Sequence, residues 1–217
     1  MTDLHHDRPW MRLDLGGPHQ VLSWAINRPG LVTATHIIWR EVRNADLPAD
    51  LNVTDWLDAQ LRSQGATDDV AFLTSRDIRA FHDVSCTQDD ITVRCIATVG
   101  LSNGEHIGTR MDRSGKDWGT INVAVQISAG LTPAALIESL AIAAQARTVA
   151  VMQAQHQLPT GITTGTGTDC IAIAAPAGNT AYAGMHTPLG EALGRAVFQA
   201  VDQGTRQWMR DVRRSQT

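Results

Sequence analysis

The chain has 217 residues, of which 43% are hydrophobic and 18% charged, a composition typical of a folded domain with one sizeable core. The formal net charge of −4 provides no basic field, so we expect no nucleic-acid partner. Three cysteines without CxxC spacing exclude a disulfide framework and a zinc knuckle, and they indicate reduced, buried thiols in a cytoplasmic protein.

No membrane partner is expected either. The first twenty residues lack the apolar segment of a signal peptide. Elsewhere the sequence suggests no window with the about 20 apolar residues of a membrane span.

The first half of the chain predicts a small sheet and one helix. In chain order we expect a polar lead-in over 1–18, strands over 21–25 and 31–42, a helix over 54–65, and strands over 70–73 and 91–99. The turn residues Asn27-Arg28-Pro29-Gly30 join the first two strands and suggest a hairpin. The strand over 91–99 has the clearest pattern, because apolar and polar residues alternate along it.

The second half predicts two long helices around a buried strand. We expect a strand over 119–127, a helix over 132–155, a strand over 170–175 and a helix over 187–210. Thr132-Pro133 and Thr187-Pro188 have the hydroxyl cap and first-turn proline of helix N-termini. Together these elements predict an α/β or α+β fold, with one domain over 19–217 in which a mixed β-sheet packs against helices.

The most polar turn of the chain lies directly before the strand over 170–175. It contains Thr164, Gly165, Thr166, Gly167 and Thr168. On extended backbone alternate side chains point the same way, so the three threonines would form a row of hydroxyls. The two glycines would let backbone N–H groups approach an oxyanion or phosphate. The segment is not a Walker loop, because it lacks the GK[ST] ending and enters a strand.

Other residues supply acid–base and amide groups. Asp169 would act as a base or hydrogen-bond the amides of its own loop, and both alternatives stay open. His186 precedes the last helix and would act as an acid, because histidine titrates near neutrality. Asn103 and Asn122 follow or lie in strand-like segments and could donate to an oxyanion. Cys170 is expected in the core, and the histidine spacings favour no metal site.

Five separated segments resemble one family in their order and spacing. They are Val99-Gly100-Leu101-Ser102-Asn103, Gly119-Thr120-Ile121-Asn122, Thr164-Gly165-Thr166-Gly167-Thr168-Asp169, Tyr182-Ala183-Gly184 and His186-Thr187-Pro188-Leu189-Gly190. The chain is similar over roughly residues 20–205 to the adenosylcobinamide amidohydrolase family (CbiZ). Each short motif alone is weak, and their order along the chain makes the resemblance specific.

The resemblance implies an activity. Members of this family hydrolyse the amide that joins the corrin propionyl side chain to aminopropanol, in adenosylcobinamide or pseudocobalamin-like corrinoids. The corrinoid is then the substrate and partner, and no separate cofactor is expected. For this reaction, residue chemistry makes Asp169 and His186 the acid–base candidates. We expect substrate binding by polar and glycine residues of the segments that carry the resemblance: Asn103, Asn122, Thr164, Gly165, Thr166, Gly167, Thr168 and Tyr182.

Three positions depart from the family pattern. Gln145-Ala146-Arg147 stands where the family usually has Glu-Ala-Lys, Trp39 lies near a usual asparagine, and Cys170 replaces a small apolar residue. The departures at Gln145 and Trp39 keep a second hypothesis open, a corrinoid-binding protein without hydrolytic activity. A third is an amidase for another small amide. The alternating strands show no obvious edge protection, which is compatible with a homodimer.

Overall fold

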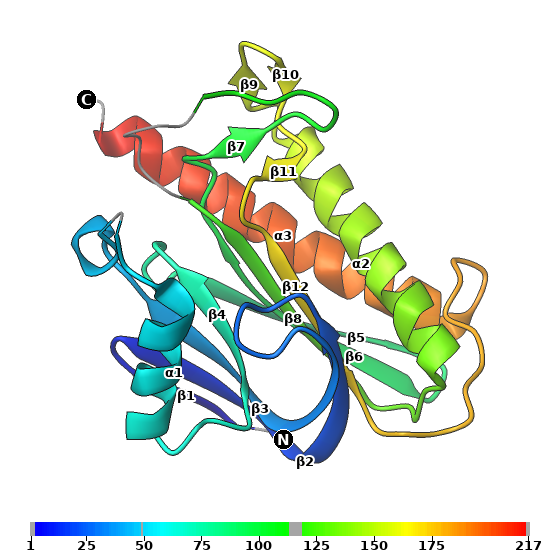
Figure 1. Ribbon diagram of the computed structural model, residues 1–217. Coiled ribbons are helices and arrows are strands. Elements are labelled where there is room, and N and C mark those ends of the chain that lie inside the picture. The colour runs from blue at the N-terminus through cyan, green and yellow to red at the C-terminus, as the bar shows by residue number, and fades with distance from the viewer. Residues whose placement is uncertain (1–2, 49, 113–118, 216–217) are drawn as a thin grey trace.

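A curved, mixed β-sheet forms the centre of the computed structural model, which describes residues 3–48, 50–112 and 119–215 (Figure 1). The sheet order is β4-β3-β2-β12-β8-β6-β5, with β1 paired to β2. Its strands are β1 (Leu4–Asp7), β2 (Trp10–Ser23), β3 (Gly30–Glu41), β4 (Val70–Thr74), β5 (Phe81–Gln88), β6 (Ile91–Val99), β8 (Ile121–Ile127) and β12 (Cys170–Ala175). The pairs β3–β4 and β12–β8 are parallel, and the other pairs are antiparallel, so the sheet is mixed as expected.

Helices and short strands complete the fold. The helices are η1 (Asn44–Asp46), α1 (Val53–Ser63), α2 (Pro133–Gln153) and α3 (Pro188–Ser215), and the short strands are β7 (Gly104–Glu105), β9 (Gln157–Leu158), β10 (Gly161–Ile162) and β11 (Gly165–Thr166). β11 pairs with β7, and β10 pairs with β9, at the upper end of the molecule in Figure 1. The two long helices and the strands over 91–99 and 170–175 confirm the predictions closely.

The N-terminal segment corrects an expectation. Residues 4–18 are not a loose lead-in, because they form β1 and the first half of β2. Met11, Leu13 and Leu15 alternate with polar residues and are buried, which is the pattern of a strand with one face in the core. The segment is polar in sequence because β1 is mostly exposed. In β2, Gly16 and Gly17 have positive φ and accompany a bulge, which disrupts the regular strand pattern there.

The two faces of the sheet bury different sets of side chains. α2 and α3 cover the face that carries Val123, Val125, Ile171 and Ile173, and α1 packs on β3 and β4. The other face turns inward, so side chains from β2, β3 and β4 meet those from β6, β8 and β12 in one core cluster. This curvature brings the end of β4 close to the start of β8, although three strands, β3, β2 and β12, separate the two in the sheet order.

Helix α2 corrects the expectation that no segment could span a membrane. By length and composition Pro133–Gln153 is apolar enough to cross one, a test that core helices also pass. In the structure it packs against α3 and β12. The N-cap prediction is confirmed, because the Thr132 side chain accepts a hydrogen bond from Ala135 N at 3.2 Å.

Candidate functional site

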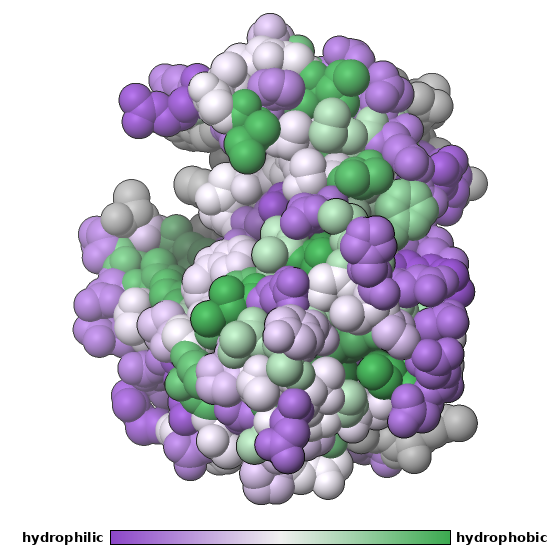
Figure 2. Space-filling view, turned by 90° about the vertical axis from the view of Figure 1, so that its right-hand side faces the viewer, coloured by the Kyte–Doolittle hydropathy of each residue, from purple (hydrophilic) through white to green (hydrophobic). Residues whose placement is uncertain are grey.

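A cavity of about 380 Å³ opens where the sheet curves back on itself. One wall is apolar, with Trp24, Ile26, Val42, Leu47 and Phe72 among its residues. The opposite wall is polar and consists of Gly119, Thr120, Asn122 and the segment Gly167–Cys170. Figure 2 shows the outline hollowed at this height, below the part that carries β7 and β11. An apolar cavity with a few convergent polar groups is the usual form of a small-molecule site.

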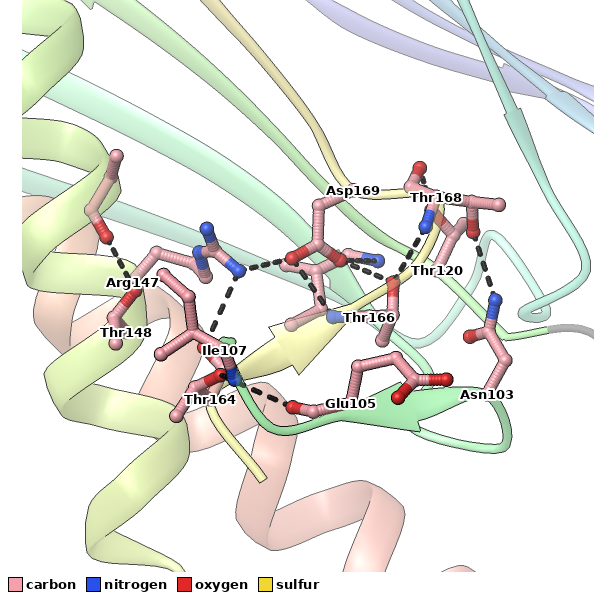
Figure 3. A network of polar contacts seen from close by, with 12 residues as sticks. Asn103, Glu105, Ile107, Thr120, Arg147, Thr148, Thr164, Thr166, Thr168 and Asp169 are labelled. Atoms are coloured by element: carbon pink, nitrogen blue, oxygen red, sulfur yellow. Dashed lines mark hydrogen bonds and ion pairs between the residues drawn. The ribbon is translucent and has the colours of Figure 1, made fainter. Parts of the chain in front are cut away.

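Asp169 is the centre of a hydrogen-bond network beside this cavity (Figure 3). Its side chain is 7% exposed and forms an ion pair with Arg147 of α2. The Thr166 hydroxyl donates to Asp169 Oδ1, and Thr166 N donates to Oδ2 at 3.0 Å. Ile121 N donates to Oδ1 at 3.2 Å. Both carboxylate oxygens are therefore engaged, and the segment before β12 is tied to α2 and β8.

Burial changes the acidity of this carboxyl group. It raises the pKa of Asp169 above its ordinary value, and this effect exceeds the opposing ones from the Arg147 charge and the hydrogen bonds of Thr166 and Ile121. A carboxylate with a raised pKa is a better proton acceptor than an exposed aspartate. The geometry offers it one hydroxyl proton among the described residues, that of Thr166.

Gly165 leaves the room that the ion pair needs. A Cβ atom at this position would lie 1.9 Å from Arg147 Nη1 and 2.6 Å from Asp169 Oδ2. By contrast, a Cβ atom at Gly167 would meet nothing within 4 Å. Gly165 is buried and does not line the cavity, so its expected role in substrate binding is replaced by a role in packing.

The threonines do not form the expected row of free hydroxyls. Thr164 is buried, accepts a hydrogen bond from Ile107 N at 2.8 Å and donates to Glu105 O at 3.1 Å, so it is not placed to bind substrate. Thr168 lines the cavity, but its hydroxyl donates to Gly119 O at 2.9 Å. The reason is that the segment crosses the end of the sheet, where buried backbone groups need partners.

The two asparagines also bond within the fold. Asn103 is 3% exposed, donates to Thr168 Oγ1 at 3.2 Å and accepts from Gly119 N at 3.2 Å. Asn122 lines the cavity, and its Nδ2 donates to Leu73 O at 2.8 Å across the curved sheet. Asn103 therefore holds two loops together, whereas Asn122 contributes to the polar wall.

Tyr182 and His186 lie at the other end of β12, which corrects their assignment to this site. Asp169 precedes β12, whereas both of these residues follow it, and the strand between spans about 16 Å. Their loop is fixed near the start of α2, where Ala183 N donates to Glu138 Oε2 at 2.6 Å. His186 cannot protonate a leaving group held beside Asp169.

Sequence reasoning missed Arg147 and Trp24. Arg147 and Glu138 are the charged residues of α2, and a charge in an otherwise uncharged apolar helix signals a buried partner. Trp24 follows β2, is 45% exposed and donates from Nε1 to Asp169 O at 2.6 Å. An exposed tryptophan at a cavity mouth is a ready contact for a flat ligand.

Of the departures from the family pattern, Cys170 lies in the polar wall and Arg147 pairs with Asp169 of that wall, whereas Gln145 and Trp39 lie away from it. Gln145 is exposed on α2, and Trp39 is fully buried against Phe72 in the inward-facing core. Neither lines the cavity. Cys170 is in the core as predicted, and burial raises the pKa of its thiol to about 12, so it is not a thiolate nucleophile.

Comparison with known proteins identifies the family. The sequence model of the adenosylcobinamide amidohydrolases matches residues 2–213. No curated protein matches the chain. Among solved structures, the PH0078 protein from Pyrococcus horikoshii OT3 is similar with 11% identity and a TM-score of 0.47, over 90% of this chain and 76% of that one. This structural likeness is too low to carry an argument.

Proposed function

The chain belongs to the adenosylcobinamide amidohydrolase family, and from this premise we propose that it hydrolyses the amide between a corrinoid propionyl side chain and aminopropanol. The products are a cobyric acid and the free amino alcohol, which would serve cobamide salvage and remodelling. The observation that carries the proposal is the buried Asp169 carboxylate that accepts the Thr166 hydroxyl beside an open cavity.

Thr166 is the proposed nucleophile; it is not itself a lining residue of the cavity, but it directly precedes Gly167, which is one. The Asp169 oxygens are occupied by donors from Thr166, Ile121 and Arg147, so they leave little room for a catalytic water. Thr166 Oγ attacks the amide carbon while its proton passes to Asp169. The C–N bond then breaks, and the same proton goes to the leaving amine. Water hydrolyses the resulting ester with Asp169 again accepting the proton, and Thr166 Oγ regains one.

Backbone amides supply the proposed oxyanion site. Gly167 N and Thr168 N each make one contact at 3.4 Å, to Asn103 O and Thr166 Oγ1 respectively. Such contacts are long for hydrogen bonds, so both N–H groups remain available to donate to a stronger acceptor. A negative oxygen is such an acceptor, and these donors lie next to the proposed nucleophile.

The cavity accommodates one edge of the substrate. A volume of about 380 Å³ is small beside a corrin ring, so the ring would stay at the mouth while one side chain enters. Trp24 and Ile26, 45% and 43% exposed, offer the ring an apolar contact at that mouth.

The test is incubation of the purified protein with adenosylcobinamide and detection of the cobyric acid by mass spectrometry. Wild type should form the product, and Asp169→Asn should form it at least about 1,000-fold more slowly because the base is lost. Corrinoid that co-elutes in gel filtration without turnover would instead favour the inactive binding protein. An unchanged rate in Asp169→Asn would remove the catalytic assignment.

A further inference from the structure

A second hollow of about 330 Å³ adjoins the cavity. The two share Val42, Arg43, Ser75 and Gly119 as lining residues, so a ligand in one can extend into the other. The second hollow is more polar, and its further lining consists of Glu41, Arg76, Asp77, Gly100, Ser102 and Trp208. The apolar cavity and the polar hollow therefore suit different parts of one molecule.

The carboxylates of the hollow are already neutralised. Glu41 accepts from Arg8 Nε at 3.1 Å and from Ile78 N at 3.2 Å. Asp77 Oδ1 accepts hydrogen bonds from the backbone N of Arg79 at 2.9 Å and from Arg79 Nε at 3.0 Å. The Arg79 guanidinium holds the pKa of Asp77 at about 2, so this pair stays charged on both sides. These carboxylates add no uncompensated negative charge.

The two arginines of the hollow retain unused donors. Arg76 is 16% exposed and pairs with Asp211 through Nη2, while its Nε is buried without a partner. The Arg43 guanidinium has no ion pair among the described residues, and its neighbour Asp46 bonds the Arg43 backbone N at 2.8 Å. Because Arg76 is paired with Asp211, Arg43 supplies the uncompensated positive charge of this hollow, in a chain of net charge −4.

Resting on the proposed function, we propose that this hollow binds a phosphate on the amino-alcohol side of the substrate. The corrin edge would occupy the apolar cavity, and the leaving group would extend past Arg43 into the polar hollow. Guanidinium groups bind phosphate by charge-assisted hydrogen bonds. The preferred substrate is then a corrinoid whose aminopropanol carries a phosphate ester, and cobinamide with a free hydroxyl is the poorer one.

The kinetic test compares adenosylcobinamide with its phosphate ester. Wild type should show a kcat/KM at least about tenfold higher for the phosphate ester, and Arg43→Gln should lose that advantage mainly through KM. Arg62→Gln, which removes an exposed arginine of α1 away from both hollows, should keep it. A corrinoid with a complete nucleotide loop shows whether a phosphodiester is accepted as well as a terminal phosphate.

A binding measurement separates this inference from the proposed function. Calorimetry with the product 1-aminopropan-2-yl phosphate should detect binding to wild type and at least about tenfold weaker binding to Arg43→Gln. Hydrolysis of both substrates at equal efficiency, with no effect of Arg43→Gln, would overturn the phosphate site and leave the amidohydrolase intact. No hydrolysis of either substrate would overturn the proposed function, and calorimetry would still decide the ligand of the hollow.

Discussion

Replacement of Gly165 by alanine tests whether the Arg147–Asp169 pair organises the site. The added Cβ would lie 1.9 Å from Arg147 Nη1, and ordinary contact begins near 3.4 Å. The guanidinium must therefore withdraw by about 1.5 Å, and Asp169 Oδ2 must also give way. Because Arg147 is a long side chain, the fold can survive this shift, but the ion pair cannot keep its geometry.

The cost can be bounded. Removal of one partner of a buried ion pair costs about 3–5 kcal/mol, which is an upper bound because Arg147 is displaced rather than deleted. Overpacking by one methyl group typically costs about 1–3 kcal/mol. We expect a loss of about 2–3 kcal/mol in the free energy of unfolding, or a Tm lower by roughly 5–10 °C for a chain of this size. Misplacement of Asp169 by about 1 Å should reduce kcat/KM about 100-fold.

Thermal unfolding and corrinoid hydrolysis measure the two effects. Gly167→Ala is the matched control for stability, because its Cβ meets nothing within 4 Å and its Tm should stay near that of wild type. If Gly165→Ala unfolds at the wild-type temperature and retains wild-type kinetics, the ion pair does not order the site and the reasoning fails.

Three further predictions follow from the same geometry. Arg147→Gln removes the charge that lowers the pKa of Asp169, so the acid limb of the kcat/KM profile should move up by about 1–3 pH units. Arg147→Lys keeps the charge and should leave the acid limb near that of wild type. Equal pH profiles for the two variants would refute the pairing. Thr166→Val should abolish hydrolysis and Thr166→Ser should preserve part of it, and an active valine variant would exclude the nucleophile. His186→Asn should leave kcat/KM within about twofold, and a loss of about 100-fold would return this histidine to the site.

Hydrophobic patterning predicted the elements that are rich in buried residues. Residues 91–99 and 170–175 form β6 and β12 with the expected bounds, and Thr132 caps α2 as expected. The pattern failed at the sheet edges. β5 has no fully buried residue, and β1 has none either, so neither strand offers an apolar stripe to recognise.

The same limit explains the misplaced site residues. Asp169 and His186 lie 17 positions apart in the chain, but β12 runs between them and carries them to opposite ends of the sheet. Arg147 is 22 positions from Asp169 and touches it, because α2 packs back along β12. Motif order along a chain does not contain this information, since it depends on which end of a strand each motif occupies.

The threonines before β12 illustrate how one local pattern can serve two needs. The hydroxyls of Thr164 and Thr168 bond backbone carbonyl groups of Glu105 and Gly119 where the loops cross, and the Glu105 carbonyl also accepts from Thr164 N at 2.9 Å. The Thr166 hydroxyl instead donates to a carboxylate, which is the one acceptor of the three that can take its proton away. The chemical asymmetry among three identical side chains therefore comes from Asp169, and this is why Thr166 is the residue whose substitution best separates catalysis from folding.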